Sequence, residues 1–295
     1  MEEMKLIDFN GRFRRDYLNW CAKHQDIAND EERIDELFYT MYTEWFRRPK
    51  QWLQGKTPEQ YFEEIGDPRM YVTMMIEYIK EDMELPDPLV TCMEERKAEV
   101  YPIIRNILFA DREEEISEDA LEEVQSHIIS LISEMDLAHP YERYIGFLRN
   151  KTEESSLLDE ASYALLEAEH LADYRESLLD AYRVAAGYGK LCLLDILSSF
   201  EGDGEIYDIL AEEFQQEEAD KGFLAGCLGK LGDSRAIPLL ERELERSDLE
   251  YMLYRELREA VEMLGGDEVA DRDFTGDRDY DFLAGQGWDD EDEQV

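Results

Sequence analysis

Apolar residues recur at intervals of three and four along most of the chain between Gly11 and Gly266. Glycine and proline stand at the ends of these periodic segments, and the strict alternation typical of strands is missing. This spacing places the apolar side chains on one face of an amphipathic helix. The sequence therefore predicts an all-α fold built from many short helices.

Several helix starts can be read directly from the sequence. Three dipeptides combine a capping oxygen with a proline at the first helical position: Thr57-Pro58, Asp67-Pro68 and Asp87-Pro88. The oxygen accepts a backbone N–H of the first turn, and proline has no N–H to leave unsatisfied there. Gln60 completes a capping box with Thr57. A proline inside a helix clashes with the preceding turn, so Pro102 is expected to divide residues 89–109 into two helices.

The second half of the chain repeats itself. One column of apolar residues has a spacing of 31: Met135, Leu166, Leu197 and Leu228. A second column keeps step with it at intervals of 31, 31 and 30: Phe147-Leu148, Leu178-Leu179, Ile209-Leu210 and Leu239-Leu240. Each period therefore holds two short helices, and neither can bury its apolar side without its neighbours.

A recurring turn joins the two helices of a period. In residues 231–235, Gly232 can adopt the left-handed conformation that ends one helix, and Asp233 then caps the next. Related Gly-Asp turns occur at 65–69, 200–204 and 264–267.

The segment LGKLGDSRAIPLLEREL, residues 228–244, resembles a HEAT-like repeat of the short bacterial kind found in phycobilisome lyase subunits. Its Gly-Asp-x-Arg-Ala turn and the following Ile-Pro-Leu-Leu carry the resemblance. The resemblance implies a right-handed α–α superhelix, a HEAT-like or armadillo-type solenoid, whose second helices line a concave surface. It implies no activity, since such arrays serve mostly as scaffolds and docking surfaces.

Three regions follow from these patterns. Residues 1–115 form an irregular helical region, rich in aromatic residues, that either continues the solenoid or caps it. Residues 116–266 form the repeat array. Residues 267–295 hold 12 acidic residues and two arginines and show no helical period, so we expect a mobile acidic tail. Its aromatic residues could dock on this chain or on a partner.

The charge of the chain limits its partners. Its 74 acidic and 31 basic residues give a formal net charge of -43. Such a field repels phosphate backbones and anionic lipid headgroups, so we expect no direct binding of nucleic acid or of a membrane. It favours a protein partner that is basic or carries a basic segment.

The sequence also indicates a compartment. The N-terminus carries acidic residues and no apolar signal segment, and no stretch is apolar enough to span a membrane. The four cysteines are far apart and match no disulfide framework or zinc site. We therefore expect a cytoplasmic protein.

No motif predicts catalysis. The chain has no Gly-x-Ser-x-Gly and no glycine-rich phosphate loop, and paired carboxylates mean little among 74 acidic residues. Glu167 and His170 have the Glu-x-x-His spacing of di-iron bundles, but the second such pair is missing. We predict no catalytic residue, no metal and no cofactor.

Two clusters are candidates for partner binding. On the predicted second helices, the positions outside the apolar columns are mostly acidic, and they form either a groove for a basic partner or a solvated face: Glu176, Asp180, Asp208, Glu212, Glu241 and Glu245. A basic and aromatic stretch near the N-terminus either packs the core of that region or binds a partner, as Trp and Arg often do at interfaces: Trp45, Arg47, Arg48, Lys50 and Trp52.

These observations favour a non-catalytic helical-repeat scaffold that binds a protein partner through an acidic concave face. The alternative is an acidic decoy, a nucleic-acid mimic or immunity-type neutraliser that covers a basic protein. An enzyme of unknown type is the third hypothesis.

Overall fold

The structure is a computed structural model, and it describes residues 6–28, 30–111, 116–217 and 219–286. Every regular element in these ranges is helical, which confirms the all-α class. The chain divides into two compact units, Met1–Pro140 with Ser155–Glu160, and Tyr141–Glu154 with Ala161–Val295. The boundary expected near residue 115 thus falls inside the first unit.

The first unit contains helices of uneven length joined by short turns. They are α1 (Phe9–Cys21), α2 (Gln25–Ala28), α3 (Glu31–Phe46), the 3₁₀ turn η1 (Gln51–Leu53), α4 (Pro58–Glu63), α5 (Pro68–Lys80), α6 (Asp87–Glu95), α7 (Lys97–Leu108) and α8 (Glu118–Glu134).

The second unit is more regular and consists mainly of helix pairs. Its elements are α9 (Tyr141–Asn150), η2 (Leu171–Tyr174), α11 (Arg175–Tyr182), α12 (Gly187–Leu197), α13 (Gly204–Phe214), α14 (Lys221–Leu231), η3 (Ser234–Ala236), α15 (Ile237–Leu244), α16 (Tyr251–Met263) and α17 (Arg278–Gln286). Helix α10 (Ser156–Leu166) begins in the first unit and ends in the second.

Two of the three predicted helix starts have the expected cap. The backbone N–H of Gln60 donates to Thr57 Oγ1 and the N–H of Thr57 donates to Gln60 Oε1, each at 3.1 Å, so the capping box is confirmed. Asp67 accepts the N–H of Arg69 at 3.0 Å. Asp87 is not a cap, however, because α6 begins at Asp87 itself and its carboxylate lies 3.0 Å from the Tyr42 hydroxyl instead.

The predicted break at Pro102 is wrong. Helix α6 ends at Glu95 and α7 runs through Pro102, whose ring is exposed to solvent. The break lies at Arg96, where the guanidinium donates to both carboxylate oxygens of Glu99, at 3.0 and 2.9 Å, and also to the carbonyl of Gly66. These hydrogen bonds fix the backbone at Arg96, between α6 and α7. Pro102, in contrast, is exposed to solvent and remains within α7.

The Gly-Asp turns have the predicted geometry. Gly202 and Gly232 have φ angles of 71° and 74°, in the left-handed region that favours glycine. Asp203 then accepts the N–H groups of Glu205 and Ile206, and Asp233 accepts that of Arg235. The turn therefore ends one helix and starts the next, as expected.

The second apolar column is confirmed, with one member from each pair fully buried at 0% exposure: Leu148, Leu179, Leu210 and Leu240. In the first column Met135, Leu197 and Leu228 are buried, but Leu166 is only half-buried. The strict 31-residue register is therefore wrong at Leu166. Its neighbour Leu165 is fully buried instead, and η2, not a Gly-Asp turn, precedes α11 there.

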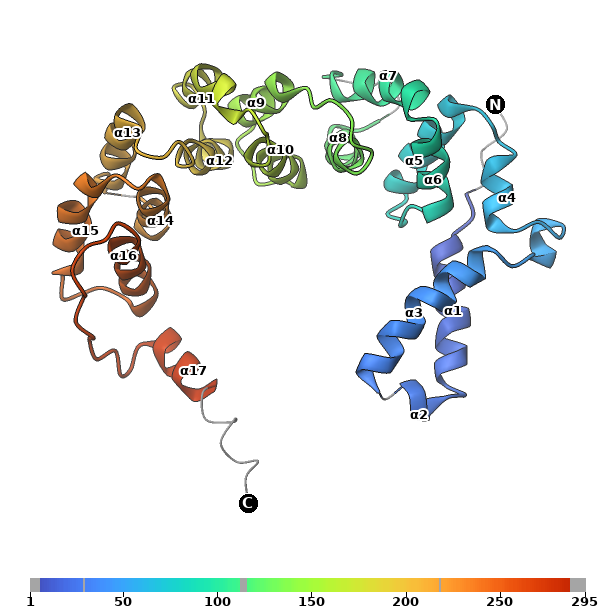
Figure 1. Cartoon of the computed structure of the whole chain (residues 1–295), viewed down its shortest axis with the longest axis horizontal. Helices are drawn as coiled ribbons and strands as arrows, with labels where there is room; N and C mark the ends of the chain where they lie inside the picture. Colours follow the sequence, from blue (N-terminus) through green and yellow to red (C-terminus); the bar gives the residue numbers. More distant parts are fainter. Residues whose placement is uncertain (1–5, 29, 112–115, 218, 287–295) are drawn as a thin grey trace. The chain divides into compact units, whose positions relative to one another are not determined.

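Within the second unit the helices form two rows, with α11, α13 and α15 in one and α12, α14 and α16 in the other (Figure 1). Each of the helices α13 and α15 packs on a helix of the other row, and α14 packs closely on α16. Gly229 permits this approach, since a Cβ atom there would lie 3.3 Å from the Cα of Ala260. The row of α12, α14 and α16 lies on the inner side of the bend in Figure 1.

A lysine–glutamate pair beside an aromatic ring occurs in two successive repeats. Lys221 of α14 lies 2.6 Å from a carboxylate oxygen of Glu243 on α15, and its Nζ is 5.2 Å from the centre of the Phe214 ring. One repeat earlier, Lys190 lies 2.7 Å from Glu213 and 5.4 Å from the ring centre of Tyr182. The same contact thus joins the two rows twice.

The negative charges of Glu243 and Glu213 are stabilised by neighbouring donors despite their burial. Burial acts to raise the pKa of Glu243, but hydrogen bonds from Lys221 and Arg246 outweigh it and lower the pKa from its usual value. The pKa of Glu213 is lowered in the same way, against burial, by Lys190 and the Tyr182 hydroxyl. Each half-buried carboxylate thus stays ionised because cationic and hydroxyl donors offset the cost of its burial.

The acidic C-terminal segment, expected to lack helical structure, forms α17 and packs on the unit. Phe274 is 8% exposed, and its ring centre lies 5.4 Å from that of Tyr251 and 5.0 Å from that of Tyr254. Arg272 donates to carbonyls of residues 244 and 246 at the end of α15, and Asp277 accepts the N–H of Tyr251 at the start of α16. The segment's charges complement the dipoles at these helix ends, which its composition did not indicate.

We predict that Lys221 and Glu243 are coupled in stability. In a double-mutant cycle with Lys221→Met and Glu243→Gln, urea unfolding should give a coupling of about 2 kcal/mol, since the side chains are only 20% and 11% exposed. The pair Arg14–Glu84, at 65% and 64% exposure, is the control and should couple weakly.

The same cycle has an expected pH dependence. Because the pKa of Glu243 is lowered on folding, its contribution is complete above the unfolded pKa and is lost only as pH falls through the folded value. The coupling should therefore be equal at pH 6 and pH 8. A coupling as weak as that of the control pair, or one that changes between these pH values, would contradict this account.

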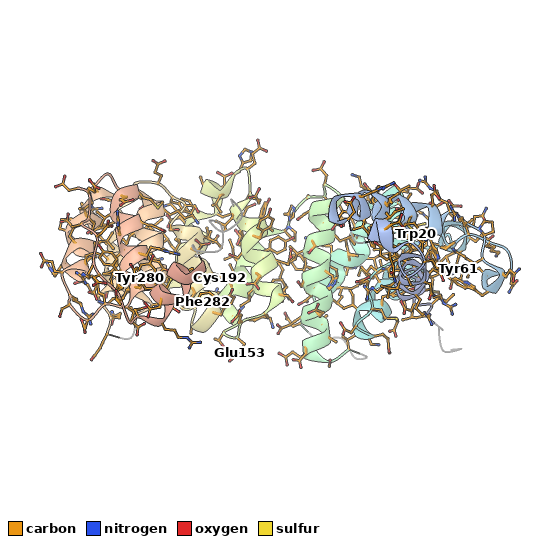
Figure 2. The ribbon with its side chains drawn as sticks, turned by 90° about the horizontal axis from the view of Figure 1, so that it is seen from below. Trp20, Tyr61, Glu153, Cys192, Tyr280 and Phe282 are labelled. Carbon is orange, nitrogen blue, oxygen red and sulfur yellow. The ribbon has the colours of Figure 1, made fainter. Side chains whose placement is uncertain are left out.

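We predict that Phe274 holds the C-terminal segment in place. Phe274→Ala should increase the rate of proteolytic cleavage within residues 267–283, because the aromatic contact with α16 is lost. Phe282, labelled with Tyr280 in Figure 2, is 63% exposed, and Phe282→Ala should leave the rate unchanged. Equal cleavage of the two variants would show that Phe274 does not anchor the segment.

Candidate functional site

The six predicted acidic residues lie as pairs on three successive second helices of the second unit, and we call them the carboxylate row. The pairs are Glu176 and Asp180 on α11, Asp208 and Glu212 on α13, and Glu241 and Glu245 on and at the end of α15. Each pair has the i, i+4 spacing that places both side chains on one helix face. All six are exposed to solvent.

The position of the carboxylate row differs from the one that the resemblance implies. A HEAT-like array would place the second helices on a concave surface, but Figure 1 shows α11, α13 and α15 on the outer side of the bend within this unit. The concave side of this unit is therefore formed by first helices.

Arginines near the row are already engaged. Arg175 donates to Asp203 at 2.8 Å and to Glu205 at 2.9 Å, and these bonds raise the pKa of its guanidinium. Arg183 lies 2.5 Å from Asp180, and Arg235 lies 2.7 Å from Asp233 and 3.6 Å from Asp208. The arginines are shared among several carboxylates, so the negative field of the face is only partly compensated.

The basic and aromatic stretch lies in the first unit, where part of it belongs to the core. Trp45 is 8% exposed and its indole N–H donates to Asp16 at 2.8 Å. The Nζ atom of Lys50 lies 3.6 Å from the centre of the Trp45 ring, and burial lowers the pKa of that ammonium. Trp52 is 41% exposed, with the Arg12 guanidinium 4.3 Å from its ring centre.

The two arginines of this stretch form ion pairs within their own unit. Arg47 lies 3.1 Å from Glu59, and Arg48 pairs with Glu44. Phe9, which is completely buried, brings the rings of α3, η1 and α4 together, with Trp52 at 5.8 Å and Phe62 at 5.2 Å. Trp45 therefore belongs to the N-terminal core, while Trp52 both contacts Phe9 and remains partly exposed.

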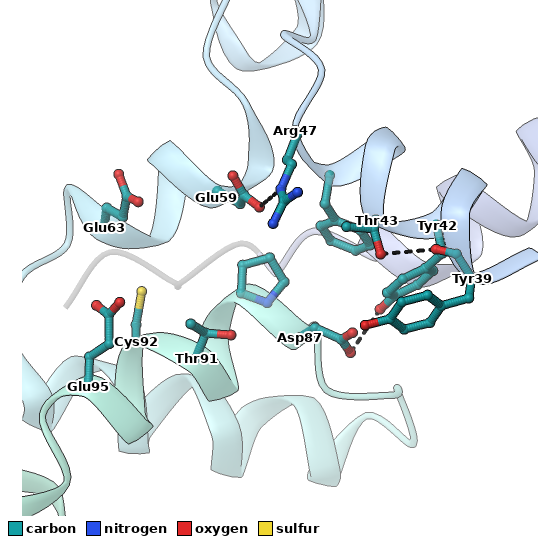
Figure 3. Close-up of a pocket in the computed structure, with 12 residues that line it drawn as sticks. Tyr39, Tyr42, Thr43, Arg47, Glu59, Glu63, Asp87, Thr91, Cys92 and Glu95 are labelled. Carbon is teal, nitrogen blue, oxygen red and sulfur yellow. Dashed lines mark hydrogen bonds and ion pairs between the residues drawn. The ribbon is translucent and has the colours of Figure 1, made fainter.

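A cavity of about 330 Å³ opens beside this cluster, between α3, α4 and α6. Figure 3 shows Tyr42 and Asp87 at one end and Glu63, Cys92 and Glu95 at the other. The Tyr42 hydroxyl lies 3.0 Å from Asp87 Oδ1 and 3.0 Å from Asn10 Oδ1. It has one proton to donate, so these two acceptors share it.

The chemistry of this cavity is not that of an activated nucleophile. Burial and the Asp87 carboxylate raise the pKa of Tyr42. Burial also raises the pKa of the Cys92 thiol, and the charges of Glu95 and Glu63 add to this. Both groups therefore keep their protons at neutral pH.

Two grooves, lined mainly by the row of α12, α14 and α16, were not foreseen from the sequence. One, of about 490 Å³, lies along α12, α13 and α14. The other, of about 420 Å³, lies along α12, α14 and α16. They share Asp220 and Phe223, so they form one continuous surface, which we call the groove face. In the sequence, only the glycines of α14 pointed to this surface. Glycine in a helix can mark either a groove or close helix packing, so the groove face could not be predicted from it.

The described residues hold no group of three or more His, Cys, Asp or Glu side chains placed to bind a metal ion. Among these same residues, no helix has the length and apolar character needed to cross a membrane. His170 and Glu167, the pair with di-iron spacing, are both exposed.

No protein-family model matches the chain, and comparison with curated proteins finds no match. The HEAT-like resemblance therefore remains a prediction that depends on the repeat at residues 228–244.

We predict that the Tyr42 hydroxyl contributes to the stability of the first unit. Tyr42→Phe should lower the free energy of unfolding by about 1 kcal/mol, since Asn10 is 9% exposed and loses a partner. Tyr39, 74% exposed at the rim of the same cavity, provides the control Tyr39→Phe, which should change little. Urea unfolding measures both, and equal effects would contradict the role given to the buried hydroxyl.

Proposed function

We propose that the protein is a non-catalytic helical-repeat scaffold that binds a basic protein, or a protein with a basic segment, through the carboxylate row. The observation that carries this is the recurrence of exposed i, i+4 carboxylate pairs on α11, α13 and α15. Negative charges repeated on three successive helices are complementary to a partner that carries several cations along an extended surface. We further propose that the helix pairs continue as a right-handed HEAT-like superhelix.

The physical basis of this function is electrostatic. The chain's net charge of -43 attracts a basic partner from a distance and raises the association rate. Exposed ion pairs contribute little singly, so affinity must come from several contacts at once. Three helix pairs with two carboxylates each provide this multiplicity.

A cytoplasmic location belongs to the same proposal. The four cysteines, all within the described ranges, form no disulfide, and burial raises the pKa of the Cys227 thiol to about 12. Protonated, buried thiols suit a reducing compartment.

The carboxylate row is tested with two variants of equal charge. In the first, the six acids of the row become amides: Glu176→Gln, Asp180→Asn, Asp208→Asn, Glu212→Gln, Glu241→Gln and Glu245→Gln. In the control, six exposed acids elsewhere in the unit are changed in the same way: Glu167→Gln, Glu169→Gln, Asp173→Asn, Glu201→Gln, Asp267→Asn and Glu268→Gln.

We predict that a labelled ten-residue oligolysine binds the first variant about tenfold more weakly than the parent, and the control variant no more than about threefold more weakly. Fluorescence anisotropy at two salt concentrations measures this, and binding should weaken as salt screens the charges. Equal losses in the two variants would show that general charge, not the row, binds the peptide.

The alternative function, an acidic decoy for a basic nucleic-acid-binding protein, would also use the carboxylate row. A basic nucleic-acid-binding protein held by the carboxylate row should be released by added duplex DNA, because the two would occupy the same basic surface. A partner that binds the row and DNA together would leave the scaffold function in place and exclude the decoy.

A further inference from the structure

The groove face presents an apolar strip that runs across three helices, α12, α14 and α16. Its floor consists of buried side chains of α12, α14 and α16, including Leu194, Leu224 and Ala260. Above the floor, Leu191 is 39% exposed and Met263 is 64% exposed, with half-buried Phe223 between the two grooves. Single exposed apolar residues need no explanation, but here they line one continuous depression.

Gly226 keeps the middle of this depression open. It lies on α14, is exposed, and a Cβ atom built there would have nothing within 4 Å. Glycine in a helix costs up to about 1 kcal/mol relative to alanine. At Gly229 a side chain would crowd α16, but at Gly226 it would meet nothing. The effect of glycine at position 226 is therefore that the groove is not filled by a side chain.

The rim of the groove face is strongly acidic. Its residues include six carboxylates and the cation Lys190, which pairs with Glu213 at 2.7 Å. Two more of the carboxylates pair with cations beside the grooves, Asp195 with Lys230 at 2.8 Å and Glu259 with Arg255 at 3.6 Å. The carboxylates are those of Asp195, Glu213, Glu217, Asp220, Glu256 and Glu259. An apolar strip between carboxylates is complementary to a segment with an apolar stripe flanked by lysine and arginine.

We propose that the groove face binds an amphipathic basic helix of a protein partner, with its apolar stripe over Leu191, Phe223 and Met263. A helix presents apolar residues at i, i+3, i+4 and i+7 along one line, which matches a strip that crosses successive helices. Its lysines and arginines then lie against the carboxylates of both grooves. This surface is formed mainly by first helices, with Glu213 of α13 at its edge. It contains none of the six residues of the carboxylate row, so it adds a second contact to the proposed scaffold.

The charge of the chain argues against two other occupants. The C-terminal segment 267–295 holds 12 acidic residues against two arginines, so the acidic rim repels it. A second copy of the chain, with a net charge of -43, is disfavoured for the same reason. A basic helix is the occupant for which both the apolar and the charged parts of the surface are complementary.

The test uses three synthetic peptides and two matched variants. The first peptide is an 18-residue helix of leucine and lysine with an apolar stripe. The second has the same composition scrambled so that the stripe is lost, and the third keeps the stripe with glutamate in place of lysine. Gly226→Trp fills the groove face, and Gly146→Trp, also in open space, places the same side chain on α9 beside Asp180 of the carboxylate row.

We expect the striped leucine–lysine peptide to bind the full chain at least about tenfold more tightly than the other two, by fluorescence anisotropy. Gly226→Trp should weaken that binding about tenfold and Gly146→Trp should not. Circular dichroism and thermal unfolding of both variants verify that they are folded. Equal binding of the striped and scrambled leucine–lysine peptides, or equal effects of the two tryptophans, overturns the groove proposal.

The failure of this proposal is distinguishable from the failure of the proposed function. If only the six-site variant of the carboxylate row loses peptide binding, the row is the binding site and the groove proposal is wrong. If only Gly226→Trp loses it, the groove binds the helix and the row does not bind it. Self-association in sedimentation that Gly226→Trp abolishes would assign the face to a second copy and overturn the proposal.

Discussion

The second unit depends on one constraint: its helices are too short to be stable alone. Helix α11 has 8 residues and α16 has 13, whereas isolated helices below about 12 to 15 residues are marginal in water. Each must bury its leucine side against neighbours, which explains why one leucine of every second-helix pair, from Leu148 to Leu240, is completely buried. Close glycine contacts and the lysine–glutamate pairs that join the two rows serve this same packing.

The internal ion pairs also shape the surface. Lys190 and Lys221 are half-buried, and an ammonium in such a position needs a carboxylate partner. Arginines near the turns are likewise engaged, as Arg175 is with Asp203. Because cations such as Lys190, Lys221 and Arg175 are used in joining neighbouring helices, the carboxylates left on the outside are only partly neutralised. The acidity of the surface is thus a consequence of packing as well as of composition.

Most features that depend on neighbouring residues were predictable from the sequence, whereas contacts between distant residues were not. The capping box at Thr57 and the Gly-Asp turns depend on residues near one another, and the second apolar column depends on a period of 30 or 31 residues. The structure has all three, although the local prediction of a break at Pro102 was wrong. Asp87, predicted to cap a helix, instead accepts a hydrogen bond from the hydroxyl of Tyr42, 45 residues away. Phe274 is buried by rings of α16. The carboxylate row was identified correctly as exposed, but the side of the bend depends on helix contacts that no local pattern contains.

Glycine on α14 has two opposite effects, and together they explain why the groove face lies where it does. At Gly229 the missing side chain lets α16 approach α14 to contact. At Gly226, nearly one turn earlier, the missing side chain faces open space and leaves a depression between the same helices. A larger residue at 229 would force the helices apart, whereas one at 226 would only fill the surface. The same helix thus both packs tightly on α16 and leaves a groove beside it, while the carboxylate row, whose six exposed side chains are all acidic, must depend mainly on charge.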